Sequence, residues 1–385
     1  MTAARALSIL VLAVVLAACG DDGQRSEDAW TWDLPDDFPE PRVPSDNPMS
    51  ASKVELGRRL FYDRRLSGNQ TQACASCHAQ ARAFSDGLRA SIGSTGEPHF
   101  RNAMALVNVA YNDVQTWANS SLVTLERQAL IPMFGEAPVE LGLVNREAEL
   151  LVRLADDPIY QDLFVRAFPA DPAPIALVNV TRALAAFQRS LISARSAWDR
   201  YTDGDRDAIS AAARRGGELF FGEKIECHHC HGGFNFTRSA TWEGKLTDEP
   251  LFANNGLYDL DGQGAYPATD QGLIEVTGLA GDMGRFRAPT LRNIAVTAPY
   301  MHDGSIATLE DVIDHYARGG RLITEGPDAG DGRTSPLRSA LVGGFTLTGT
   351  EREDLLEFLR SLTDDDFLVD PRHADPWAGT VSAAP

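Results

Sequence analysis

The chain has 385 residues, and its 54 acidic and 35 basic side chains give a formal net charge of -19 at pH 7. A chain of this length is expected to form two domains of ordinary size, each with its own core. The acidic balance disfavours nucleic acid and anionic lipid as partners. It would suit a basic redox partner or protein substrate, and solubility alone could equally account for it.

The N-terminus carries Arg5 and then an apolar run over residues 6–18. Because 13 residues are too few to span a bilayer, residues 1–18 are predicted to be an export signal. The run ends in LAAC at residues 16–19, which resembles the cleavage box of bacterial lipoproteins. We therefore expect a lipid at Cys19, a periplasmic location and membrane contact only through that lipid. The alternative is a chance cysteine within the signal.

Residues 19–48 follow this signal and are first polar and then rich in proline. Such a composition is typical of a tether that leads to a folded body. The tether contains Trp30, Trp32 and Phe38, which we expect to pack against that body.

The four other cysteines form two pairs, each followed by a histidine: CASCH at residues 74–78 and CHHCH at residues 227–231. Disulfides are the default in an exported protein, and a zinc site uses the same residue types, but neither explains a histidine after each pair. In C-x-x-C-H, two thiols bind one haem and the imidazole reaches its iron, so we predict two c-type haems. The predicted attachment residues are Cys74, Cys77, Cys227 and Cys230, and the predicted proximal iron ligands are His78 and His231.

Similar short segments precede the two motifs, LGRRLFY at residues 56–62 and RGGELFF at residues 215–221. Each predicts a helix with a glycine and a leucine-aromatic pair that leads into the cysteine loop. Clear strand alternation is found nowhere in the sequence. Helical periodicity also runs through residues 147–167, 175–193, 308–319 and 350–362.

These patterns predict an all-α fold of two cytochrome c-type domains, each with one covalently bound haem. The N-terminal domain is expected over residues 49–200 and the C-terminal domain over residues 206–365. The connection lies near residues 196–207, and residues 366–385 are expected to form a tail.

A further pattern follows the first motif, with Trp117, Gln128, Pro132 and then Glu140 shortly before Gly142. Together with the two cysteine motifs, this pattern resembles the bacterial di-haem cytochrome c peroxidase and MauG family. The resemblance covers most of the chain, from about residue 47 to residue 362. It implies an open haem in the first domain, at which hydrogen peroxide reacts.

The resemblance also implies catalytic roles. Glu140 takes the position of the acid-base group, Gln128 would orient the peroxide, and Trp117 would lie between the haems and relay an electron. A carboxyl group is needed because cleavage of peroxide moves a proton from one oxygen to the other. The residues themselves leave alternatives open: Glu140 could be an exposed loop acid, with Glu136 as the substitute, and Trp117 could be a core residue.

The sequence departs from the family pattern at residues 91–96, SIGSTG. Ser94 stands where conventional peroxidases of the family have a histidine that blocks the first haem until the second is reduced. His99 lies a few residues further on and could replace it. The simpler prediction is a first haem that is open as isolated, without reductive activation.

The second haem is served by RAPTLRN at residues 287–293 and TAPYMHDG at residues 297–304, blocks that are characteristic of the family. Counted from Pro299, the family register implies that Tyr316 is the sixth ligand of this haem, as in MauG-like enzymes, where conventional peroxidases have methionine. An oxygen ligand favours higher oxidation states than a thioether does. Tyr316 could instead pack in an apolar helix stripe. That stripe contains Leu309, Val312 and Ile313, and other conceivable ligands are Met283, Met301 and His315.

A calcium ion between the domains is also implied by the resemblance, held by an asparagine side chain and two backbone carbonyls. The matching positions are Asn102, Thr297 and Pro299, and such hard oxygen donors suit calcium. The Gly- and Asp-rich residues 254–284 could hold another ion, although a long covering or bridging loop is the favoured interpretation.

Tyr316 and the missing blocking histidine favour a MauG-like enzyme that activates hydrogen peroxide and oxidises a residue of a partner protein. WTWDLP at residues 30–35 resembles the subgroup that includes the di-haem enzyme of methanobactin operons, which implies a tryptophan as the oxidised residue. One alternative is a conventional di-haem peroxidase supplied with electrons by a small cytochrome or cupredoxin. Others are a non-catalytic electron carrier and a zinc- or disulfide-stapled protein without haem.

Overall fold

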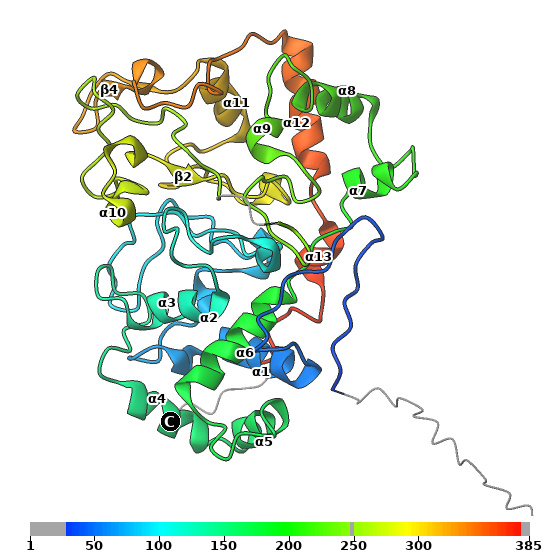
Figure 1. The fold of residues 1–385 in the computed structure, drawn as a ribbon, viewed down its shortest axis with the longest axis vertical. Helices are drawn as coiled ribbons and strands as arrows, with labels where there is room; N and C mark the ends of the chain where they lie inside the picture. The colour runs from blue at the N-terminus through cyan, green and yellow to red at the C-terminus, as the bar shows by residue number, and fades with distance from the viewer. Residues whose placement is uncertain (1–27, 247–249, 379–385) are drawn as a thin grey trace, which may run out of the picture.

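The computed structural model describes residues 28–246 and 250–378, and the predicted export signal and Cys19 lie outside these ranges. Figure 1 shows two groups of helices, one below the other, with the labelled strands in the upper group. The lower group contains α1 (Ala51–Tyr62), α2 (Leu125–Gln128), α3 (Leu130–Phe134), α4 (Glu147–Ala155), α5 (Pro158–Ala167) and α6 (Leu177–Arg189). The upper group contains α7 (Ala197–Thr202), α8 (Ala211–Phe220), α9 (His228–His231), α10 (Ile274–Thr277), α11 (Leu309–Ala317) and α12 (Gly349–Ser361), and α13 (Asp365–Val369) lies at the junction.

The prediction of an all-α fold is confirmed in part: the structure is rich in helices, but it adds two short antiparallel ladders. β1 (Phe252–Ala253) pairs with β2 (Phe286–Arg287), and β3 (Leu322–Ile323) pairs with β4 (Gly330–Asp331). Each strand has only two residues, which is too short for an alternating pattern to be seen in the sequence.

The periodic stretch at residues 147–167 forms two helices rather than one. Helix α4 ends at Ala155, and α5 begins at Pro158, whose ring is tolerated at the first position of a helix. The Asp157 side chain accepts a hydrogen bond from the backbone N–H of Ile159 and thereby caps α5. The helical periodicity of the sequence therefore continues across a break between two helices, which Asp157 and Pro158 create.

The two repeat segments are helical, as predicted, and both helices begin at a serine. The hydroxyl of Ser50 accepts from the N–H of Lys53 at the start of α1, and that of Ser210 accepts from the N–H of Ala213 at the start of α8. Such caps satisfy backbone donors that the first helical turn leaves free.

Each repeat helix crosses a second helix at a glycine. A Cβ added to Gly57 of α1 would lie 1.9 Å from the carbonyl oxygen of Ala183 in α6. A Cβ added to Gly216 of α8 would lie equally close, 1.9 Å, to the carbonyl oxygen of Asp354 in α12. Only glycine permits such close approach of two backbones. The same crossing therefore occurs once in each half of the molecule.

Aromatic pairs continue this equivalence beside both crossings. The ring of Phe61 lies 5.2 Å from that of Phe187, and the ring of Phe220 lies 4.9 Å from that of Phe358. All four side chains are buried in one of two separate hydrophobic clusters. The molecule thus has two cores, each organised by one repeat helix and its partner.

Two segments contribute to the core of the opposite half. Ala118, from the loop after the first motif, is buried in the second core. Phe367 of α13 is buried in the first core, where its ring lies 5.8 Å from that of Phe84. Further along the segment expected to be a tail, the indole N–H of Trp377 donates to the carbonyl of Arg59 at 3.1 Å.

The described part of the expected tether, residues 28–48, also contacts the body. Phe38 is buried, with its ring 4.9 Å from that of Phe234 and 6.3 Å from that of Tyr111. Trp30 and Trp32 are only partly exposed and contact each other edge to face. The prediction that Phe38 packs against the body is confirmed.

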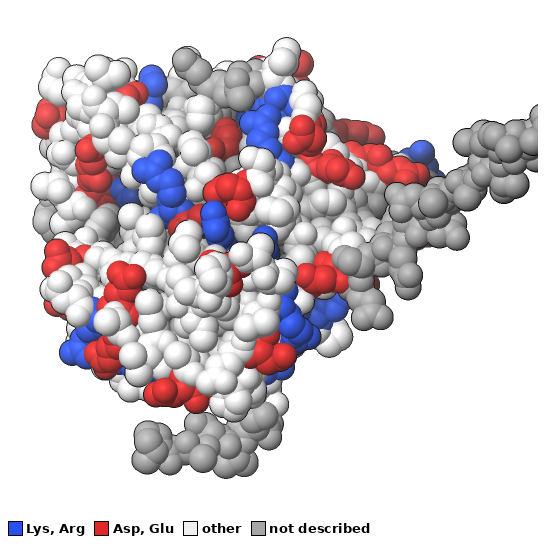
Figure 2. Space-filling view, turned by 60° about the horizontal axis from the view of Figure 1, so that its bottom comes forward, with Lys and Arg blue, Asp and Glu red and all other residues white. Residues whose placement is uncertain are grey.

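The surface in Figure 2 shows acidic and basic side chains intermixed over the displayed face, with uncharged surface between them. The net negative charge is therefore not gathered into one acidic patch on this face. Within residues 28–246 and 250–378, no helix has the length and apolar character needed to cross a bilayer.

Candidate functional site

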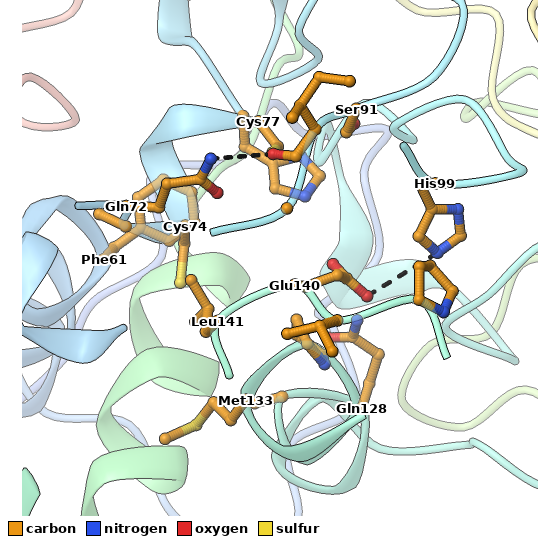
Figure 3. Close-up of a pocket in the computed structure, with 18 of the residues that line it drawn as sticks. Phe61, Gln72, Cys74, Cys77, Ser91, His99, Gln128, Met133, Glu140 and Leu141 are labelled. Carbon is orange, nitrogen blue, oxygen red and sulfur yellow. Dashed lines mark hydrogen bonds and ion pairs between the residues drawn. The ribbon is translucent and has the colours of Figure 1, made fainter. Parts of the chain in front are cut away.

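A cavity of about 780 Å³, including its open mouth, lies in the first half of the molecule. The first cysteine motif, the hairpin at residues 91–99 and the loop after α3 face one another across it (Figure 3). Its wall includes the predicted residues Cys74, Cys77, His78, His99, Gln128 and Glu140, together with apolar side chains such as Phe61, Leu106, Met133, Leu141 and Leu184.

His78 is held in a defined orientation by its first ring nitrogen. The Nδ1 atom lies 2.7 Å from the carbonyl oxygen of Phe84. Because a carbonyl oxygen can only accept, Nδ1 must carry the hydrogen, which leaves the lone pair of Nε2 free to bind a metal. Burial lowers the pKa of His78 and so favours the neutral ring that metal binding requires.

The second motif repeats this arrangement. His231 ends α9, and its Nδ1 lies 3.1 Å from the carbonyl oxygen of Pro289. Burial lowers the pKa of His231 to about 4. Both histidines are therefore held as neutral rings with the hydrogen on Nδ1, which a backbone carbonyl accepts. This is the form in which histidine binds a metal through Nε2.

The four described cysteines are free in the structure. Burial raises the pKa of the Cys74 and Cys227 thiols to about 12. A thioether carries no charge and therefore suits these buried positions. The residues of both motifs fit covalently attached haem.

Glu140 is placed by close backbone contacts. Its carbonyl oxygen accepts from the N–H of Ser94 at 2.7 Å, and a Cβ at Gly93 would lie 1.8 Å from the carbonyl oxygen of Val139. Gly93 thus lets the hairpin at residues 91–99 lie directly on the loop that carries Glu140.

The Glu140 carboxyl faces the cavity and the first motif. The side chain is 36% exposed, but burial of the carboxyl group against the cavity wall raises its pKa to about 7. Its negative charge in turn raises the pKa of both Cys74 and Cys77, which shows that the carboxyl lies near these thiols. Glu136 is exposed and is not part of the cavity wall. Of these two acids, only Glu140 lines the cavity.

Gln128 reaches the same cavity from the end of α2 (Figure 3). This short helix is fixed by a buried ion pair in which both guanidinium Nη atoms of Arg189 in α6 bind the carboxylate of Glu126, at 2.7 and 2.8 Å. The bidentate geometry holds α2 in one orientation and therefore holds the Gln128 side chain as well.

Trp117 lies at the boundary between the halves. Its indole N–H donates to the carbonyl of Asn102 at 3.0 Å, and its own carbonyl accepts from the N–H of Arg287 at 2.7 Å. The side chain is partly buried against the second core. This position is compatible with both interpretations of Trp117, the electron relay and the packing residue.

Arg287, which begins the RAPTLRN block, is a buried charge for which the sequence predicts no role. Its guanidinium donates to the carbonyl of Thr116 and to the side-chain oxygen of Asn112, each at 3.2 Å. Burial lowers its pKa to about 10, and the nearby carboxylate of Asp113 opposes this shift. The residue connects β2 to the segment that carries Trp117.

Tyr316 on α11 faces the second motif. Burial raises its pKa to about 12, and the charges of Cys227 and Cys230 act in the same direction, which places the phenol near these sulfurs. Leu309 and Ile313 of the same helix are buried in the second hydrophobic core, which does not include Tyr316.

Two rival ligands have other partners. The Nε2 of His315 lies 3.0 Å from the carbonyl oxygen of Asn255, and the Sδ of Met301 accepts from the Asn255 side chain at 3.2 Å. Met283 packs at the edge of the second core. Tyr316 also interacts with the Asn255 side chain, and its role as the sixth ligand stays a prediction.

The residues predicted to bind calcium lie in neighbouring segments. The backbone N–H of Asn102 donates to the carbonyl of His302, three residues after Pro299, and its side chain donates to the carbonyl of Leu88. The Thr297 hydroxyl donates to the carbonyl of Ile294. These contacts bring the two segments together, and calcium binding stays a prediction.

The comparisons with known proteins agree with this site. A family profile described as di-haem cytochrome c peroxidase matches residues 51–207. The cytochrome-c peroxidase IdrP1 of Pseudomonas sp. (strain SCT) is 34% identical over 87% of this chain and 86% of its own length. The methylamine utilization protein MauG of Methylorubrum extorquens is 35% identical over 85% of this chain and 82% of its own.

A crystal structure of a MauG-like protein associated with microbial copper homeostasis shares 52% identity with this chain. It superimposes with a TM-score of 0.89 and covers 91% of this chain and 100% of that chain. With the paired cysteine motifs and the acid-lined cavity described above, these relatives show that the chain is a di-haem oxidoreductase of the cytochrome c peroxidase and MauG family.

Proposed function

We propose that the protein is an exported, MauG-like enzyme that activates hydrogen peroxide in the first cavity and oxidises a residue of a partner protein. The observation that carries this proposal is Glu140, a carboxyl with a pKa of about 7 that faces the first haem-binding motif across the cavity. An electron carrier has no need of such a group. When bound, haem c would supply an iron that binds peroxide and stores oxidising equivalents.

Glu140 would act as the acid-base group. With a pKa of about 7, it can take a proton from one peroxide oxygen and return it to the other near neutral pH. Gln128 projects into the same cavity, where its amide would orient the peroxide by hydrogen bonding. His78 and His231 would be the proximal ligands, and the carbonyls behind their Nδ1 atoms would increase their basicity.

Tyr316 would be the sixth ligand at the second motif, supported by its position near Cys227 and Cys230. A phenol oxygen favours oxidised iron, which suits storage of an oxidising equivalent better than reception of donor electrons. Trp117, at the boundary of the halves, would carry electrons between the two sites.

The proposal also includes the partner protein and the cellular location. The MauG-like relative of known structure is associated with microbial copper homeostasis, and we propose the same setting for this chain, with a tryptophan of a periplasmic partner protein as the substrate. We further propose a lipid anchor at Cys19 and one calcium ion held by Asn102 with the carbonyls of Thr297 and Pro299. The C-terminal boundary of the second domain would fall near residue 365.

A conventional cytochrome c peroxidase is the second candidate, favoured by relatives with that name and by a histidine, His99, in the cavity wall. A stopped-flow spectrum of the oxidised protein mixed with stoichiometric hydrogen peroxide separates the two. The proposed enzyme reacts without prior reduction. A reaction that requires reduction of the second haem would support the peroxidase and contradict our proposal.

The Glu140→Gln variant tests the carboxyl directly. Loss of acid-base catalysis should slow the reaction with peroxide by about 100-fold or more. Glu136→Gln is the matched control, because that carboxyl is four residues away, exposed and outside the cavity wall. Equal rates for Glu140→Gln and the wild type would remove Glu140 from the mechanism.

A further inference from the structure

His99 is brought to the cavity by the hairpin at residues 91–99. The N–H of His99 donates to the carbonyl of Ser91 at 2.7 Å, and the N–H of Gly93 donates to the carbonyl of Glu97 at 2.8 Å. The His99 side chain is 22% exposed and lines the cavity beside Glu140. Its ring stacks on that of Phe100 at a centroid distance of 4.7 Å, which fixes the plane of the imidazole.

The tautomer of His99 follows from its second neighbour. Its Nδ1 accepts a hydrogen bond from the backbone N–H of Arg101 at 2.9 Å. A neutral imidazole that accepts at Nδ1 must carry its hydrogen on Nε2. That Nε2 lies 3.8 Å from Oε1 of Glu140, as the dashed line in Figure 3 shows. The Nε2–H of this tautomer therefore lies near the Glu140 carboxyl, just beyond hydrogen-bond distance.

Burial and the surrounding charges favour the neutral form of this ring. Burial and the guanidinium of Arg101 lower the pKa of His99, and the carboxylate of Asp270 opposes them. Arg101 and Asp270 form a bidentate ion pair with both contacts at 2.7 Å, so neither charge is free to pair with the imidazole. Protonation of Nδ1 would also break its hydrogen bond with Arg101. These contacts favour a neutral His99 that donates through Nε2.

We propose that His99 is a positioning residue for Glu140, whose Nε2–H donates to the carboxylate and holds it over the cavity during peroxide cleavage. This inference rests on the proposed function of Glu140. The Nε2 of His99 and the Oε1 of Glu140 are 3.8 Å apart, slightly too far for a hydrogen bond. Catalytic hydrogen bonds are often long in enzymes without bound substrate and tighten when substrate binds. A role as the blocking ligand of the first haem is disfavoured, since Nδ1 is occupied and Nε2–H has no free lone pair.

The test compares His99→Ala with His99→Gln. The Gln side chain keeps an N–H donor near the position of Nε2, so it should retain most of the rate. His99→Ala should slow the reaction with peroxide by about 10- to 100-fold, the usual cost of losing a group that orients a ligand or an acid-base partner. Its rate should also rise at a higher pH than in the wild type, because a donor to the carboxylate favours the charged form.

A readout other than turnover comes from the absorption spectrum of the oxidised protein. A positioning residue leaves the spectrum of the first haem unchanged in both variants. A changed spectrum together with faster reaction of His99→Ala would identify His99 as a blocking ligand and overturn the inference. A His99→Ala variant whose rate and pH profile match those of the wild type would also overturn the inference.

The double variant keeps the inference separate from the proposed function. If His99 acts through Glu140, His99→Ala should have no further effect in a Glu140→Gln background. If Glu140→Gln reacts like the wild type, the proposed function fails. If Glu140→Gln is slow and His99→Ala slows it further by the same factor as in the wild type, only the positioning role fails.

Discussion

Replacement of Gly57 by alanine should destabilise the first half of the molecule, although alanine is the better helix former. The new Cβ would lie 1.9 Å from the carbonyl oxygen of Ala183, whereas ordinary contact begins at 3.4 Å, so α1 and α6 would have to separate by about 1.5 Å. Overpacking costs about 1–3 kcal/mol. Because the obstructing atoms are backbone, the upper end applies, and the roughly 1 kcal/mol gained in helix propensity leaves a net loss of about 2 kcal/mol.

Guanidinium-induced unfolding, followed by circular dichroism, would measure this loss as a lower midpoint at unchanged slope. The matched control is Gly349→Ala in α12, where an added Cβ meets no atom within 4 Å. This control should unfold at the midpoint of the wild type or slightly above it. If Gly57→Ala also unfolds at the midpoint of the wild type, the close crossing of α1 and α6 is not what requires glycine.

Four further outcomes are expected. The reaction with peroxide should become faster as the pH rises through about 7 and then level off. Below that pH, the raised pKa of Glu140 keeps its carboxyl protonated, so that it cannot accept a proton. A flat pH–rate profile from stopped flow would contradict this prediction. Tyr316→Phe should change the absorption spectrum of the second haem, and an unchanged spectrum would exclude Tyr316 as its ligand. Trp117→Phe should leave the peroxide reaction intact and slow oxidation of the partner, and equal rates of both steps in variant and wild type would make Trp117 a packing residue. Phe367→Ala should cost about 3–5 kcal/mol in unfolding free energy, and a midpoint equal to that of the wild type would show that α13 contributes little to the first core.

The motifs could be predicted from sequence because their chemistry is local. Cys74, Cys77 and His78 lie within five residues, and the 3-10 turn that joins them needs no distant partner. Glu140 was identified by family register. Its cavity position depends on Gly93, whose contact with the neighbouring loop becomes visible only in three dimensions.

Other features depend on contacts between distant segments and therefore left no pattern in the sequence. His99 could be named as a candidate, but its relation to Glu140 arises from a hairpin that brings together residues 41 positions apart. Arg287 reads as an ordinary charged residue until its burial beside Trp117 is seen. The β ladders have two residues in each strand, and strands of that length carry no periodicity.

The exchange of Ala118 and Phe367 between the two cores should couple the folding of the two halves. A polypeptide that ended at residue 200 would lack α13 and expose the apolar surface around Phe84, and one that began at residue 206 would lose Ala118 from its core. Proteolytic cleavage at the exposed residues 202–207 would accordingly yield two fragments that stay associated. An enzyme that must keep two redox centres at a fixed separation gains from this interlocking, since neither half can drift from the other without losing part of its own interior.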